Sequence, residues 1–112
     1  MKGLAVAVFT CGLAVASTQA WAIKHGDPVA GAKKAQTCFA CHGKGGHSTN
    51  AMYPILAGQY ADYIIRALHD YKDGIRQNPI MRGMAGSLSD KDIQDLAAYF
   101  SSQPTTLYTL KR

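Results

Sequence analysis

Cys38-Phe39-Ala40-Cys41-His42 is the stretch of this sequence that decides its fold. Two cysteines three positions apart, followed at once by a histidine, form the C-x-x-C-H pattern of a covalent haem c attachment site. On a helix, positions i, i+3 and i+4 share one face, so both sulfurs and the imidazole would point the same way. The pattern therefore predicts thioethers from Cys38 and Cys41 to the haem vinyl groups. It also predicts His42 as the proximal axial ligand of the iron.

Three other chemistries also use a pair of cysteines. A thioredoxin-like redox pair requires a βαβ setting, which the chain does not show. A zinc site could combine Cys38 and Cys41 with two histidines from the set His42, His47 and His69. Structural zinc usually takes ligand pairs separated by a dozen or more residues, whereas here the third ligand would directly follow the second. A structural disulfide between the two cysteines is the last alternative, and the haem interpretation is favoured over all three.

The first residues differ in composition from the rest of the chain. Lys2 is followed by an apolar stretch over residues 4–16 and then by Ala20-Trp21-Ala22, the pattern of a secretory signal peptide. Spanning a bilayer takes about 20 residues, so this stretch is short for a membrane helix. We expect cleavage of residues 1–22, with an uncleaved anchor as the alternative, and a single soluble periplasmic domain over residues 23–112. Export favours the haem interpretation, because haem c is attached outside the bacterial cytoplasm.

The charge of the chain is moderately positive. Lys and Arg number 12 against 7 Asp and Glu, for a formal net charge of +5, and the basic residues are spread along the sequence. Nothing forms the dense basic run of a nucleic-acid-binding tail, so we expect no nucleic-acid partner. The positive balance either steers the protein toward an acidic partner surface or belongs to an ordinary solvated surface.

Two helices are predicted on either side of the first long loop. The first begins at Asp27, an N-cap residue, with Pro28 at the first helical position, and runs toward Cys38. The second covers residues 59–73, where apolar side chains fall on one face, and Gly74 supplies its C-terminal stop.

A third helix begins at Ser89, with Asp92 three residues later as a variant of the capping box, and ends before Pro104. The loops at residues 43–58 and 74–88 do not alternate like strands. Structureless loops of that length are uncommon in compact domains, and a large ligand wrapped by them would explain both. A chain this short also builds a thin core, which a buried porphyrin would enlarge. The fold class is therefore all-α, with three helices and two long loops.

The second axial ligand must come from farther along the chain. The candidates are His25, His47, His69, Met52, Met81 and Met84. Met81 and Met84 lie in the predicted loop with few other apolar residues, where core packing explains them less well. A methionine thioether stabilises ferrous iron and raises the reduction potential, which suits electron transfer.

Five segments in a fixed order resemble a known family. They are G-D-P-V-A-G at 26–31, C-F-A-C-H-G at 38–43, Y-P-I-L-A-G-Q at 53–59, I-M-R-G-M-A-G-S-L-S-D at 80–90 and D-L-A-A-Y-F at 95–100. The resemblance is to the class I c-type cytochromes, and most closely to single-haem bacterial members that are similar to one half of the periplasmic dihaem cytochromes. It covers residues 26 to about 103. It implies the class I fold, in which three to four helices wrap around one covalently bound haem.

The resemblance also implies roles for single residues. It assigns the distal ligand to Met81 and makes Met84 a packing residue. Pro54 corresponds to the proline whose backbone carbonyl accepts a hydrogen bond from the proximal histidine, a bond that fixes ring orientation and ligand basicity. Leu56 would line the haem pocket. Arg76 would approach a haem propionate, unless it is an ordinary solvated arginine. Gly31 in the first helix and Tyr99 in the last correspond to the residues at which the terminal helices of this family cross closely.

These features predict a periplasmic single-haem carrier that moves one electron at a time between redox proteins. The donor and the acceptor are not specified by the sequence. Both axial positions would be filled, and partners would dock at a haem edge ringed by residues such as Lys44 and Arg82. An enzyme with an open iron site is disfavoured, because no distal acid/base pair is evident. The more serious alternative is a haem subunit bound permanently to a dehydrogenase or oxidase, with the same site chemistry. The protein is thus expected to be a monomer or a complex subunit.

Overall fold

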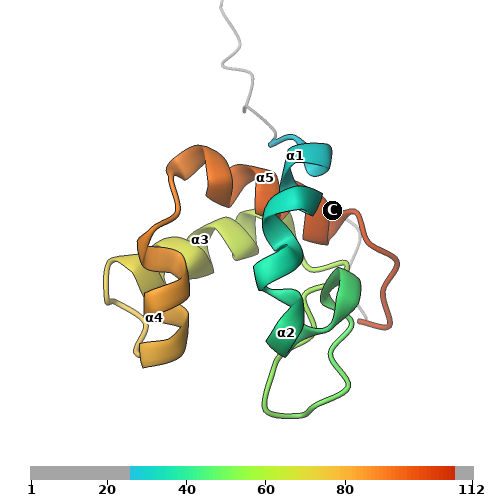
Figure 1. Cartoon of the computed structure of the whole chain (residues 1–112), viewed down its shortest axis with the longest axis horizontal. Coiled ribbons are helices and arrows are strands. Elements are labelled where there is room, and N and C mark those ends of the chain that lie inside the picture. The colour runs from blue at the N-terminus through green and yellow to red at the C-terminus, as the bar shows by residue number, and fades with distance from the viewer. Residues whose placement is uncertain (1–25, 108–112) are drawn as a thin grey trace, which may run out of the picture.

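The computed structural model describes residues 26–107, and its regular elements in that range are all helical (Figure 1). The all-α prediction is therefore confirmed for this part of the chain. The elements in chain order are α1 (Pro28–Lys34), the 3₁₀ helix η1 (Ala35–Thr37), α2 (Phe39–His42), the 3₁₀ helix η2 (Lys44–Gly46), α3 (Ala61–Lys72), α4 (Pro79–Gly86) and α5 (Asp90–Ser101). None of the helices described here is long and apolar enough to cross a membrane. The predicted signal peptide at residues 1–22 and the candidate ligand His25 lie outside the described residues.

Two of the helices begin as the sequence predicts. The Asp27 carboxylate accepts a hydrogen bond from the Val29 N–H, with proline at the first position of α1. At the start of α5, the Ser89 side chain accepts from the Asp92 N–H while the Asp92 carboxylate accepts from the Ser89 N–H. This is a complete capping box, and it satisfies two N–H groups that the helix itself leaves without a partner.

The structure corrects two of the predicted elements. The first helix is not continuous to Cys38, because α1 ends at Lys34 and a 3₁₀ turn separates it from α2. The segment 74–88 is not structureless, because it contains α4. The start of α4 repeats the signal used for α1, a capping Asn78 followed by Pro79. Three glycines in the segment obscured that signal, since glycine disfavours helix interiors.

The helices pack around a small core on α5. This helix packs on both α1 and α3, and α3 also packs on α4. Figure 1 shows α3 and α5 running across the molecule, with α1 and α2 toward one end and α4 at the other. The buried core consists of Ala35, Ile64, Leu96, Ala97 and Phe100. Cys38 and Phe39 of the C-x-x-C-H turn pack against this core, so the turn has a fixed place in the fold.

The terminal helices α1 and α5 touch backbone to backbone at Gly31. A Cβ atom on Gly31 would overlap the Asp95 carbonyl oxygen and lie 2.8 Å from the Tyr99 Cβ. Real Cβ atoms do not approach other atoms that closely, so this crossing requires glycine. The close crossing of the terminal helices expected from the resemblance is present.

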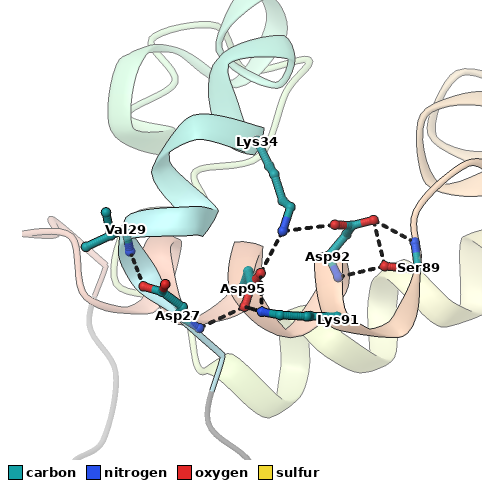
Figure 2. Close-up of polar contacts among 7 residues, drawn as sticks. All are labelled: Asp27, Val29, Lys34, Ser89, Lys91, Asp92 and Asp95. Carbon is teal, nitrogen blue, oxygen red and sulfur yellow. Dashed lines mark hydrogen bonds and ion pairs between the residues drawn. The ribbon is translucent and has the colours of Figure 1, made fainter.

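A polar cluster reinforces the same helix pair (Figure 2). The Asp95 carboxylate is fully buried and accepts from the Asp27 N–H at 2.8 Å, from Lys34 Nζ at 2.6 Å and from Lys91 Nζ at 2.9 Å. Lys34 Nζ also lies 2.9 Å from an Asp92 oxygen. The Lys34 hydrogen bond, joined by those of Asp27 and Lys91, holds the pKa of Asp95 well below its usual range. We call these five residues the terminal-helix clamp.

Candidate functional site

The C-x-x-C-H residues lie on one compact turn that is held against the core. Cys38 is the N-cap residue of α2, while Cys41 and His42 belong to the helix itself. Both cysteine thiols are free and half-buried, and burial raises the pKa of the Cys38 thiol. The Phe39 ring lies 6.2 Å from the Tyr99 ring and 6.5 Å from the Phe100 ring, centroid to centroid. These aromatic contacts hold α2 against α5.

The His42 imidazole is buried and oriented by one hydrogen bond. Its Nδ1 atom lies 2.8 Å from the Pro54 carbonyl oxygen, and the residue is only 6% exposed. A carbonyl oxygen can only accept, so Nδ1 is the donor, and in the neutral imidazole this leaves the Nε2 lone pair for a metal. The Tyr53 ring packs edge-on at 6.2 Å from the imidazole centroid. Sequence reasoning missed this contact, because nothing in the sequence distinguishes Tyr53 from a loop residue.

The loop that delivers Pro54 is pinned to the core. The Gly46 carbonyl accepts from the N–H groups of Leu56, at 2.9 Å, and Ala57, at 3.2 Å. Gly46 has φ +84°, and a Cβ atom there would lie 2.9 Å from both the Ala57 nitrogen and a Phe100 ring carbon. Only glycine adopts this conformation in so little space. The turn places Pro54 opposite His42 and leaves Leu56 half-buried against the core.

Met81 and Met84 lie three residues apart on α4 and differ in burial. Met81 is in the first turn and is half-buried, and Ala85 one turn later is fully buried. Met84 is 41% exposed and shares its face with Ile80, which is 64% exposed. The Asn78 side chain accepts from the Met81 N–H at 3.0 Å and so fixes the backbone at this residue. Asn78 was not singled out from the sequence, although the Asn-Pro pair signals a helix start.

The remaining candidates lie in less suitable places. Met52 is 81% exposed and His47 is also exposed, whereas His69 is half-buried within α3. Arg76 is exposed, and its guanidinium donates to the Tyr63 hydroxyl at 3.3 Å and lies 4.9 Å above the Tyr71 ring. The Tyr63 hydrogen bond raises the pKa of Arg76.

The cytochrome c family model matches residues 28–104, which include every element from α1 to α5. This chain belongs to the cytochrome c family. Members of the family bind haem c covalently, and this assignment decides between haem and the redox-pair, zinc and disulfide alternatives. The helical fold is the class I cytochrome c fold, as the resemblance implied.

Two relatives show how far the similarity extends. Cytochrome c4 of Pseudomonas aeruginosa is 49% identical over 78 residues, which are 70% of this chain and 39% of that protein. Cytochrome c-554(548) of Halomonas halodenitrificans is 47% identical over 81 residues, 70% of this chain and 98% of that protein. The chain therefore spans less than half of the cytochrome c4 relative and nearly all of cytochrome c-554(548).

Two solved structures are similar to this cytochrome. Reduced recombinant cytochrome c4 from Pseudomonas stutzeri superposes with a TM-score of 0.67 at 43% identity, over 70% of this chain and 46% of that chain. Thiosulfate dehydrogenase (TsdBA) from Marichromatium purpuratum superposes with a TM-score of 0.69 at 33% identity, over 77% of this chain and 21% of that chain.

The residues present in this cytochrome fit a covalently bound haem. Cys38 and Cys41 offer two free thiols at the attachment spacing, next to a histidine whose Nε2 is left available by the Pro54 hydrogen bond. Half-buried apolar side chains from α2, the 43–58 loop and α3 surround the small core near this turn. Covalent haem c needs two thiols for attachment, an imidazole nitrogen for the iron and apolar surroundings for the ring, and this region provides all three.

Proposed function

We propose that this cytochrome is a periplasmic one-electron carrier that acts between redox proteins and catalyses no reaction itself. The observation on which the proposal rests is the His42–Pro54 hydrogen bond beside the paired thiols. It sets the imidazole in the tautomer and orientation of an axial ligand. When bound, the haem iron supplies a reversible change between the ferric and ferrous states.

The site residues have distinct roles in this proposal. Cys38 and Cys41 form the thioethers, and His42 and Met81 are the two axial ligands. The Pro54 carbonyl orients His42. Leu56 would supply apolar contact in the haem pocket, and Arg76 would approach a haem propionate. With His42 and Met81 both bound to the iron, no coordination position would stay open for a substrate.

The burial pattern of α4 supports Met81 as the distal ligand. Met81 is half-buried and lies one turn before the buried Ala85, whereas Met84 is 41% exposed and lies one turn after the exposed Ile80. Side chains on the inward face of a helix are the ones that reach the interior of the fold. The Asn78 cap further restricts the backbone from which the Met81 side chain extends.

Docking with partners is proposed to be brief and partly electrostatic. Lys44 and Arg82 are exposed, and the chain has a formal net charge of +5. Positive charge around the docking region speeds encounters with acidic partners, and small interfaces let the partners separate quickly. The basic, apolar and A-x-A pattern of residues 1–22 supports export to the periplasm.

A permanent haem subunit of a dehydrogenase is the second candidate. Two findings favour it, the similarity to thiosulfate dehydrogenase TsdBA and the exposed apolar side chains Ile75 and Ile80. Gel filtration of protein from the native host separates the two functions. Elution at the size of one chain supports the free carrier. Co-elution of the haem with a dehydrogenase activity supports the subunit.

Spectroscopic redox titration of protein made in a host that attaches haem c tests the carrier function. We expect reversible uptake of one electron per chain and no binding of carbon monoxide by the reduced protein, because both axial positions are filled. Rapid carbon monoxide binding would reveal an open iron site and favour the enzyme alternative. Absence of covalent haem would overturn the assignment of Cys38 and Cys41.

A further inference from the structure

Lys72 holds the end of the segment that contains Met81. It is the last residue of α3, and its Nζ donates to the Leu88 carbonyl oxygen at 2.5 Å. Leu88 lies between α4 and α5, and its own N–H donates to the Ala85 carbonyl at 3.1 Å. The ammonium group therefore links α3 to the point where the Met81-bearing helix ends. Hydrogen bonds with a charged donor are stronger than neutral ones.

The beginning of the same segment is also held by α3. The Arg76 N–H donates to the Asp70 carbonyl at 2.9 Å, and its guanidinium contacts Tyr63 and Tyr71. A single α3 helix thus fixes both ends of segment 74–88. The two attachments differ in kind. The Arg76 attachment uses a backbone bond and several side-chain contacts, whereas the far end combines the Lys72 hydrogen bond with packing of the Leu88 side chain against the core.

Between these attachments, α4 packs on α3 but buries little of its own surface. Ala85 is its only buried residue, and most of its other side chains are exposed. Local opening of a segment requires only that its own contacts break, so a lightly buried helix opens at lower free energy than the core. Loss of the Lys72 hydrogen bond should therefore act first on α4.

We propose that Lys72 is a positioning residue that keeps Met81 on the iron by holding the Leu88 carbonyl. This inference rests on the proposed ligand role of Met81. The Lys72–Leu88 hydrogen bond closes segment 74–88 against α3, and its rupture lets α4 and Met81 move away together. The consequence is kinetic access to the iron for outside ligands, with the core of α1, α3 and α5 intact.

Imidazole binding to the ferric protein measures this access, because imidazole replaces a distal methionine only after that bond opens. Lys72→Met keeps the aliphatic stem and removes the donor, and we expect it to speed imidazole binding about tenfold. Lys72→Arg retains a charged donor and should stay near the wild-type rate. An unchanged rate in Lys72→Met would overturn the proposal, as would a fast rate in Lys72→Arg.

Lys34→Met provides the matched control. Lys34 also binds a partner on another helix through its ammonium group, but in the terminal-helix clamp between α1 and α5. This variant should lower resistance to guanidinium unfolding while leaving the imidazole rate unchanged. Equal acceleration in Lys34→Met would show that the effect follows overall stability, and it would contradict the specific role of Lys72.

The wild-type protein separates failure of this inference from failure of the proposed site. A ferric spectrum without the weak long-wavelength band of methionine-ligated haem would overturn the Met81 assignment and the role of Lys72 together. A spectrum with the band, combined with an unchanged rate in Lys72→Met, would overturn the role of Lys72 alone.

Discussion

At the scale of single residues, backbone groups far apart in the sequence decide the geometry of this cytochrome. His42 gains its tautomer from the Pro54 carbonyl oxygen, 12 residues away. Gly31 lets α1 approach the backbone of α5 at Asp95. In both cases the partner is a backbone carbonyl oxygen, so only the residue that faces this oxygen has to be of a particular type. His42 must supply the donor, and Gly31 must supply the space.

Gly31→Ala should destabilise the protein. The new Cβ would overlap the Asp95 carbonyl oxygen, and relief requires the two helices to separate. Overpacking of this kind typically costs about 2 kcal/mol of unfolding free energy. Guanidinium unfolding followed by far-UV circular dichroism measures the loss.

Gly86→Ala is the control for that substitution. Gly86 is also helical, but a Cβ atom there meets nothing within 4 Å. Its stability should stay within about 1 kcal/mol of wild type or rise, because alanine favours helix. Equal losses in the two variants would contradict a specific close contact at Gly31.

At the scale of elements, the terminal-helix clamp joins segments that are distant in the chain. Asp95 on α5 accepts from Asp27 and Lys34, which lie 68 and 61 residues away. Lys34, followed by Asp27 and Lys91, holds the pKa of Asp95 well below its usual range. The pKa of Asp92 is lowered to about 2, mainly by its hydrogen bonds with Ser89 in the capping box and then by Lys34. Groups with a depressed folded-state pKa stabilise the fold when they are ionised.

The stability gained from these carboxylates should depend on pH in one direction. It is fully present above the unfolded-state aspartate pKa of about 4 and is lost as the pH falls through the lower folded-state values. The difference in unfolding free energy between wild type and Asp95→Asn should therefore be about 2 kcal/mol at pH 7. It should shrink as the pH falls from about 4 toward 2. Denaturant unfolding at several pH values gives the two curves.

Asp73→Asn serves as the comparison, because Asp73 is exposed and lies outside the clamp. Its unfolding curve should follow that of wild type at every pH. A constant difference between wild type and Asp95→Asn over the acid range would argue against a stabilising charge on Asp95.

Elements fixed by contacts between neighbouring residues can be predicted from the sequence, whereas elements fixed by distant contacts cannot. The starts of α1 and α5 were predicted because a cap involves neighbours along the chain. The end of α1 at Lys34 was not predicted, because nothing in the local sequence forbids a longer helix. The start of α4 was readable at Asn78-Pro79, but its glycines argued for a loop.

The candidate site likewise has a local part that the sequence reveals and a long-range part that it does not. The C-x-x-C-H turn is a local motif and was found from the sequence alone. The pairing of Pro54 with His42 came only from the family resemblance, and the structure places the two atoms 2.8 Å apart. Lys72 was missed, because its partner is a backbone carbonyl on a different element and no residue type marks such an acceptor.

At the scale of the whole molecule, the net charge should govern encounter rates, since it stays positive when Lys2 is removed with residues 1–22. Reduction by an anionic reagent should slow as ionic strength rises, and reduction by a cationic reagent should quicken, because salt screens attraction and repulsion alike. Stopped-flow traces over a range of salt concentrations test this. Rates that are independent of salt for both reagents would show that charge has no part in docking.

The central claim about the whole molecule is that its polypeptide closes both axial positions of one haem. The weak long-wavelength band of the ferric protein reports the methionine–iron bond directly. We would record it for wild type, Met81→Ala and Met84→Ala. The band should be present in wild type, absent in Met81→Ala and retained in Met84→Ala. A wild-type protein without the band, or a band that survives in Met81→Ala, would contradict the closed His42/Met81 site.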